Sequence, residues 1–168
     1  SGLYAFGRQP EAIHWNAAQL AVSLRALVDA EPLIAALDEF APAFQREMAA
    51  ALLWRLGLTP RGEAEDRALA QVLERSLRAT AAPLDRTFFD LFGGRMPEGY
   101  GAEWAELRAA LAPYRPRRPR EDRYWSEAPC TMLIEEVEAI WAPIAAADDW
   151  SLFEAKIAAI RAMGAALA

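Results

Sequence analysis

Apolar residues recur every three or four positions through nearly the whole chain, and this period limits the fold more than any other feature. The first such stripe is Ile13, Ala17, Leu20, Leu24 and Leu27. This spacing places the side chains on one face of an α-helix. A half-buried strand needs apolar and polar residues in alternation, and no segment shows that pattern convincingly. The sequence therefore predicts an all-α fold.

Seven helical segments follow from the stripes and from the residues that begin and end them. Their expected starts lie near Pro10, Pro32, Asp66, Pro83, Trp104, Leu133 and Ser151. Pro42 lies inside the second segment and predicts a kink or a break, because proline has no N–H to donate. Gly57 predicts the end of that segment, and Ser151 with Glu154 predicts a capping box. We expect an irregular bundle of six or seven helices.

The stretch 113–127 is the clearest interruption, with three prolines and five arginines. We interpret it as a linker between a helical core at 1–112 and a C-terminal helical pair at 128–168. Its arginines are Arg115, Arg117, Arg118, Arg120 and Arg123. Such arginines could bind phosphate, and the neighbouring aromatic residues could stack on bases. Because three carboxylates reduce the stretch to a net charge of +2, we favour a linker packed on an acidic surface over a nucleotide site.

The overall charge and the apolar pattern limit the partners. The net charge is −6, which disfavours a general nucleic-acid binder because such affinity depends on neutralising phosphates. No apolar run approaches the roughly 20 residues of a membrane span. The single cysteine excludes an internal disulfide and fits a reducing compartment. We therefore expect a cytoplasmic chain with neither a membrane nor a nucleic-acid partner.

The only histidine and the only cysteine are the obvious candidates for catalysis. His14 could act as a general base, but no serine or cysteine near it in the sequence completes a triad. Cys130 has Pro129 and Thr131 as neighbours, and neither activates a thiol. Together the two residues cannot supply the four ligands of a structural zinc site. We predict a packed or half-exposed histidine and a buried, inert cysteine.

Two acidic runs and one glycine pair complete the candidates. The acidic residues are Glu135, Glu136, Glu138, Asp148 and Asp149. Paired carboxylates can transfer protons or bind Mg²⁺, but these flank predicted helix starts, where negative charge is favourable. Gly93-Gly94-Arg95 lacks the Lys and Ser/Thr of a phosphate loop. The sequence thus predicts no catalytic, cofactor-binding or metal-binding residue in this chain.

A more specific pattern opens the chain. Tyr4-Ala5-Phe6-Gly7-Arg8-Gln9-Pro10 is followed by Trp15-Asn16 and Leu20-Ala21, and later by Glu65-Asp66, Leu69 and Asp85-Arg86-Thr87-Phe88-Phe89. This pattern resembles the selenoprotein O family, the bacterial YdiU proteins, over about residues 1–92. Departures are Arg8, where members often have Asn or Trp, Ala17, where Leu is common, and the missing C-terminal cysteine or selenocysteine. From the residues themselves, we expect Gln9 and Asn16 to satisfy backbone donors at a helix start, and Tyr4, Phe6 and Trp15 to anchor the opening loop on a core.

The resemblance implies a pseudokinase fold that transfers AMP from ATP to Ser, Thr or Tyr of other proteins with Mg²⁺ or Mn²⁺. In family members the glycine-rich loop, the Lys–Glu pair and the catalytic and metal-binding residues precede the Tyr/Gln-Pro segment, so none maps onto this chain. The resemblance therefore implies the C-terminal helical part of the kinase-like large lobe, partnered by the upstream lobes and by protein substrates. Such a part would bind no cofactor and would be inactive alone. A non-catalytic helical interaction module is the alternative.

Overall fold

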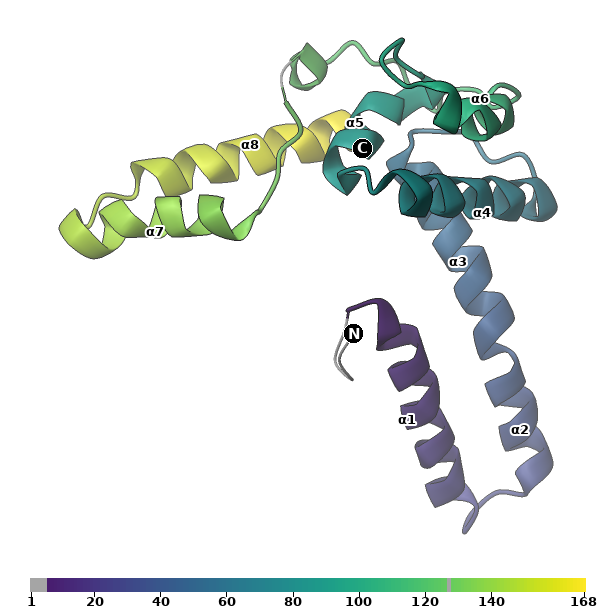
Figure 1. The fold of residues 1–168 in the computed structure, drawn as a ribbon. Helices are drawn as coiled ribbons and strands as arrows, with labels where there is room; N and C mark the ends of the chain where they lie inside the picture. The colour runs from purple at the N-terminus through teal and green to yellow at the C-terminus, as the bar shows by residue number, and fades with distance from the viewer. Residues whose placement is uncertain (1–5, 127) are drawn as a thin grey trace. The chain divides into compact units, whose positions relative to one another are not determined.

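The structure is a computed structural model that describes residues 6–126 and 128–168 (Figure 1). It divides into two compact units, Ser1–Met48 and Ala49–Ala168. The described residues form eight α-helices and four short 3₁₀-helices, with no β-strand and one isolated bridge between Leu58 and Pro116. The predicted all-α fold is confirmed. No helix of the described residues has both the length and the apolar character needed to cross a membrane.

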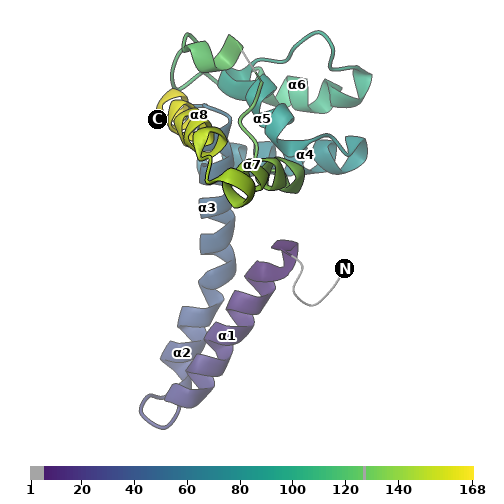
Figure 2. The same ribbon diagram turned by 90° about the vertical axis from the view of Figure 1, so that its left-hand side faces the viewer.

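The first unit is a pair of helices with little interior. Helices α1 (Gln9–Leu24) and α2 (Ala30–Asp38) lie side by side in both ribbon views (Figures 1 and 2). The His14 ring stacks on Phe40, with 5.0 Å between the ring centroids. Neither α1 nor α2 has a buried residue. Most of their large apolar side chains are therefore open to solvent.

The predicted break at Pro42 divides the second expected helix. It ends as α2 at Asp38, and α3 (Phe40–Arg55) begins after Glu39. Pro42 cannot donate to the Asp38 carbonyl, and its ring crowds that carbonyl, so the helix stops there. This division explains why the structure has eight helices where the stripes predicted six or seven.

The predicted end of α3 at Gly57 is also confirmed. The Gly57 N–H donates to the Trp54 carbonyl and the Leu58 N–H donates to the Leu53 carbonyl, both at 3.0 Å. This pair of bonds is a Schellman motif, which needs a residue with positive φ. Gly57 has φ +64°, and a Cβ there would lie 2.5 Å from the Phe92 ring. Only glycine meets both demands.

The remaining helices enclose the core of the second unit. They are α4 (Glu63–Thr80), α5 (Leu84–Leu91), α6 (Ala105–Leu111), α7 (Ile134–Ala147) and α8 (Ser151–Leu167). The main core is Leu53, Leu56, Leu58, Leu69, Leu73, Leu91, Trp104, Leu107, Leu111 and Tyr114. A second cluster is Phe89, Phe92, Trp125, Ala166 and Leu167, which joins α5 to the end of α8.

The segment 113–126, here named the arginine strap, packs within the second unit. The Thr59 N–H donates to the Arg115 carbonyl at 2.9 Å, and the Arg117 N–H donates to the Gly57 carbonyl at 2.7 Å. Trp125 at its end is buried in the second cluster. The strap is therefore held by backbone hydrogen bonds as well as by side chains. The domain boundaries expected at 112 and 128 stay a prediction.

The predicted capping box at Ser151 and Glu154 is wrong. Ser151 is the first residue of α8 and Trp150 occupies the N-cap position, with no side-chain capping bond. The Asp149 carboxylate instead accepts from the Ser151 N–H at 2.9 Å, and this backbone hydrogen bond lowers the pKa of Asp149. The sequence has two acidic residues that could accept from the Ser151 N–H, Asp149 and Glu154. In the structure Asp149 is the acceptor.

Candidate functional site

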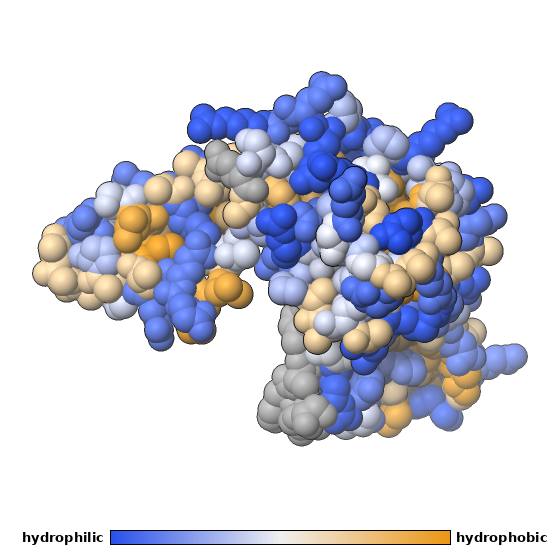
Figure 3. Space-filling view, turned by 45° about the horizontal axis from the view of Figure 1, so that its top comes forward, coloured by the Kyte–Doolittle hydropathy of each residue, from blue (hydrophilic) through white to orange (hydrophobic). Residues whose placement is uncertain are grey.

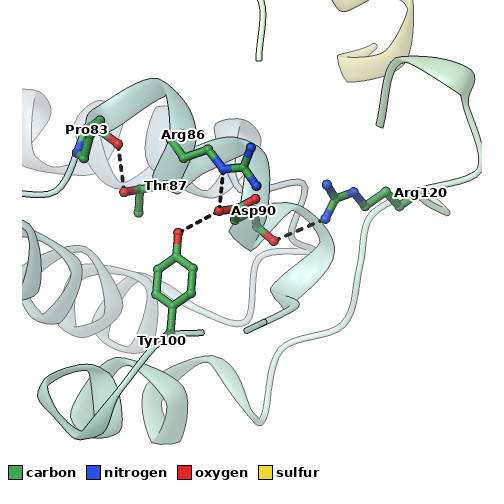
Figure 4. Close-up of polar contacts among 6 residues, drawn as sticks. All are labelled: Pro83, Arg86, Thr87, Asp90, Tyr100 and Arg120. Atoms are coloured by element: carbon green, nitrogen blue, oxygen red, sulfur yellow. Dashed lines mark hydrogen bonds and ion pairs between the residues drawn. The ribbon is translucent and has the colours of Figure 1, made fainter. Parts of the chain in front are cut away.

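The family-like run 85–89 lies in α5 and leads to a buried carboxylate. Thr87 Oγ1 donates to the Pro83 carbonyl at 2.9 Å, which closes the first turn of the helix. Asp90 is only 8% exposed. Its Oδ2 accepts from Arg86 Nε at 2.8 Å and from the Tyr100 hydroxyl at 3.1 Å (Figure 4). We name Arg86, Asp90 and Tyr100 the Asp90 cluster.

The electrostatics of the Asp90 cluster keep its donors protonated. Burial, followed by the nearby Asp90 carboxylate, raises the pKa of Tyr100 to about 12. The hydrogen bond to Asp90 raises the pKa of Arg86. A buried carboxylate is costly unless its oxygens are paired, and here one cation and one hydroxyl supply the pairing. The cluster therefore ties the loop at Tyr100 to α5, which is a structural role.

A second carboxylate fixes the start of α4. Asp66 Oδ1 accepts from the Arg61 N–H at 3.1 Å and from the Tyr114 hydroxyl at 2.9 Å. Burial and then this hydrogen bond raise the pKa of Tyr114. Tyr114 belongs to the arginine strap, so the bond joins the strap to α4. Asp66 thus fixes the strap at Tyr114, as Asp90 does at Arg120.

The guanidinium groups of the strap bind main-chain carbonyls. Arg117 donates to the carbonyls of Leu167 and Ala168, and Arg118 donates to that of Ala165 at 3.0 Å. Carbonyls at the C-terminal end of a helix have no intrahelical partner and carry partial negative charge. The expected acidic surface is therefore the carbonyl end of α8. This differs from the prediction, because the negative partner is a helix end and no acidic side chain takes part in these hydrogen bonds.

Arg120 is placed between aromatic rings. Its guanidinium lies 5.0 Å from the ring centroids of both Phe89 and Trp125, and it donates to the Asp90 carbonyl at 3.2 Å (Figure 4). Burial, followed by the charge of Arg95, lowers the pKa of Arg120. With Arg117 and Arg118 also engaged, three of the five strap arginines already bind groups of this chain. These donors are already engaged within the chain, which disfavours the alternative that the strap binds a nucleotide.

His14 and Cys130 take different surroundings. His14 is exposed and stacked on Phe40, in line with the packed or half-exposed residue that the sequence suggested. Cys130 is half-buried rather than buried, and its N–H donates to the Tyr124 hydroxyl at 3.3 Å. It lines a groove of about 310 Å³ with Arg55, Asp85, Thr131, Met132, Leu133, Ile160 and Met163.

The acidic runs have local structural partners. Glu136 forms an ion pair with Lys156, whose side chain is 10% exposed, and accepts from Thr131 Oγ1 at 3.1 Å. The hydrogen bond from Lys156 lowers the pKa of Glu136. Asp148 accepts from Trp150 Nε1 at 2.7 Å. Across residues 6–126 and 128–168, no group of three or more His, Cys, Asp or Glu residues is arranged to bind a metal. The prediction that the chain holds no site residues stays a prediction.

The opening motif is only partly described. Tyr4 and the side chain of Phe6 lie outside the described residues. Gln9 is the first residue of α1, and Arg8 occupies the N-cap position without a side-chain capping bond. The expected role of Gln9 and Asn16 at the helix start stays a prediction. Trp15 is 63% exposed, so its expected anchoring on a core is wrong for this chain.

Comparison with known proteins gives the relationship. The family model for "Protein adenylyltransferase SelO" matches residues 1–100. The chain belongs to this family. The matched stretch includes α1 to α5 and the whole Asp90 cluster. The arginine strap and helices α7 and α8 lie beyond it.

Three curated relatives show how much is shared, and each is named "Protein nucleotidyltransferase YdiU". The chain is 37% identical to that of Pseudomonas aeruginosa (strain LESB58) over 98 residues, 58% of this chain and 20% of the relative. It is 40% identical to that of Aromatoleum aromaticum over 87 residues, 51% and 16%. It is 33% identical to that of Azotobacter vinelandii over 91 residues, 54% and 18%. The chain thus spans about a fifth of their length. No solved structure matches the chain.

Sequence reasoning missed the groups that organise the second unit. Asp90, Tyr100 and Lys156 were not singled out. Arg86 and Asp90 are four residues apart, a spacing at which side chains pair on a helix, so this ion pair could have been predicted from the sequence. The contact of Tyr100 with Asp90 could not, because it depends on the turn between α5 and α6.

Proposed function

We propose that this chain is the C-terminal helical portion of a longer protein adenylyltransferase that transfers AMP from ATP to Ser, Thr or Tyr hydroxyls of other proteins. Membership of the SelO family and the fifth of the relatives' length that the chain covers support this proposal. In it, ATP and Mg²⁺ or Mn²⁺ bind to the pseudokinase lobes of the parent protein. The proposed location is the cytoplasm, where ATP is available.

Two observations support placing ATP and its metal outside this chain. No described cluster of carboxylates suits a divalent cation, and Arg117, Arg118 and Arg120 already bind this chain's own carbonyls. Nucleotidyl transfer depends on cations held where charge develops. We therefore assign this chain a supporting role: it holds part of the parent fold in place and does not contact the reacting atoms.

The uncovered apolar surface of α1 and α2 carries the proposal. Exposed large side chains here are Ile13, Trp15, Leu20, Val22, Leu27, Val28 and Ile34. Covering one such side chain is worth roughly 1.5–3 kcal/mol, and apolar patches of this kind mark interfaces. Because α1 and α2 lie within the matched residues, we propose that the upstream lobes of the parent cover this surface.

Two measurements test the proposal. Titration calorimetry of this chain with ATP and Mg²⁺ should show no binding, whereas micromolar affinity would overturn the supporting role. The longer protein encoded by the gene should transfer labelled AMP from ATP to protein hydroxyls in the presence of Mg²⁺ or Mn²⁺. If the longer protein binds no ATP and transfers no AMP, the proposed transferase activity is wrong.

The alternative is a non-catalytic helical interaction module. The exposed apolar residues of α7, beyond the matched region, favour it. The coding sequence upstream of Ser1 separates the two. A kinase-like set of Lys, Glu, Asn and Asp there supports the transferase, and its absence makes the interaction module the first choice.

A further inference from the structure

Helices α7 and α8 form a hairpin that extends away from the core of the second unit (Figure 1). Its base is well held: Ala166 and Leu167 are buried against Phe92 and Trp125, and Arg117 binds the end of α8. Between the helices, Lys156 of α8 pairs with Glu136 of α7. These contacts hold the hairpin to the core at its base and hold its two helices together.

The apolar face of α7 is wide and only partly covered. The face toward α8 carries Ile140, Pro143 and Ile144, which are half-buried. The outer stripe is Ile134, Val137 and Trp141, exposed by 64%, 37% and 61%. Met132 and Leu133 extend the apolar surface before the helix. Figure 3 shows hydrophobic side chains gathered on this projecting part of the molecule. Helix α8 covers one side of this apolar face, so the exposed side is available for a partner.

The charged residues of the stretch 128–155 are all acidic, and the nearest cations are Lys156, which pairs with Glu136, and Arg55, which lines a groove with Met132 and Leu133. Between residues 128 and 155 the chain has six carboxylates and no Lys, Arg or His. They are Glu135, Glu136, Glu138, Asp148, Asp149 and Glu154. Such a surface repels phosphates and anionic lipids, and like charges oppose the pairing of two copies of the hairpin. It attracts a partner with Lys and Arg.

We propose that the outer face of α7 binds a basic amphipathic helix of another protein. Ile134, Val137 and Trp141 stand at i, i+3 and i+7, the spacing with which two helices share an apolar seam. Glu138 and Glu135 lie along one edge of the seam, where they would pair with the cations of the partner. The inference does not rest on the proposed AMP transfer, because α7 lies outside the residues matched to the family.

The test uses the whole chain and a labelled peptide of about 18 residues, five helical turns, built from Leu on one face and Lys on the other. A peptide with Glu in place of Lys is the matched probe. Fluorescence anisotropy should show binding of the Lys peptide alone. Trp141→Ser should weaken that binding about tenfold. Glu135→Gln with Glu138→Gln should weaken it about threefold and reduce its salt dependence.

The control variant is Trp15→Ser. Trp15 and Trp141 have similar exposure, 63% and 61%, so a general loss of sticky surface would affect both variants equally. Equal binding of the two peptides, binding of neither, or an equal effect of the two tryptophan variants would overturn the proposal. Self-association that Trp141→Ser abolishes would overturn it in favour of a second copy. If circular dichroism shows that Trp141→Ser has lost helix, the glutamine variant decides the outcome.

Discussion

Helices α1 and α7 resemble each other in one respect, since neither buries any residue. They differ in the charges around their apolar stripes. Near α1 both signs occur: Arg8 pairs with Glu11, and Arg25 follows the helix. The stretch 128–155 around α7 has six carboxylates and no basic residue, and Lys156 of α8 pairs with one of them, Glu136. α1 also belongs to the matched residues, whereas α7 does not. The comparison teaches that exposed apolar area marks an interface, while its charged border and its place in the family indicate which kind of partner it meets.

The largest expected difference between α1 and α7 concerns Trp15 and Trp141 in the longer protein. If the parent covers α1, Trp15→Ser should lower the free energy of unfolding by about 3 kcal/mol. Trp141→Ser, on a surface that stays open until a partner binds, should change it by less than about 0.5 kcal/mol. Chemical denaturation of both variants measures the difference. Equal effects would contradict the assignment of α1 to the parent and α7 to another protein.

The attachment of the hairpin gives the next largest effect. Arg117→Ala removes two hydrogen bonds to the last carbonyls of α8, and we expect it to destabilise the second unit by about 1–2 kcal/mol. Hydrogen exchange should become faster in α7 and α8 and unchanged in α1. Arg118→Ala removes one bond at an exposed site and should have a smaller effect. Exchange that accelerates equally in α1 would show that the two regions are not independent.

A smaller, pH-dependent difference should separate the same regions. The hydrogen bond from Lys156 lowers the pKa of Glu136 below its ordinary 4.5. A carboxylate with a lowered pKa in the folded state stabilises the fold above the unfolded value and loses that contribution as the pH falls below it. The hairpin should therefore loosen below pH 4.5, as followed by amide exchange in α7. Glu136→Gln should abolish this pH dependence of amide exchange in α7, whereas the control variant Glu138→Gln should retain it.

The smallest expected effect concerns the start of α8. Asp149 accepts from the Ser151 N–H, and the N-cap residue Trp150 makes no side-chain capping bond. Asp149→Ala should therefore lower the melting temperature more than Ser151→Ala, because it removes the acceptor at the helix start. The reverse order would restore the capping box that the sequence suggested.

Local backbone chemistry explains what the sequence could predict of the fold. Pro42 and Gly57 mark a break and an end because a missing N–H and a positive φ act on their own neighbours. The predicted pairing of Ser151 with Glu154 failed because the Asp149 carboxylate, and not that of Glu154, accepts from the Ser151 N–H. A local rule cannot rank two such acceptors.

Distance along the chain explains what the sequence could not predict of the candidate site. The binding of Arg117 to the end of α8 joins residues 50 positions apart, and the contact of Asp66 with Tyr114 joins residues 48 positions apart. Neither pairing leaves a periodic signal. Trp15 was expected to pack on a core, but it is 63% exposed in the structure.

The turn at Gly57 has a consequence for the order in which the second unit assembles. The Leu56 carbonyl accepts from the Gly93 N–H, and the Gly57 carbonyl accepts from the Arg117 N–H, each at 2.7 Å. Three stretches that leave the ribosome at different times therefore converge on one turn. Such non-local contacts form slowly, because loop closure must precede them. During synthesis, the second unit cannot be completed before the strap has emerged, and a nascent chain that ends before Arg117 leaves the Gly57 carbonyl without that donor.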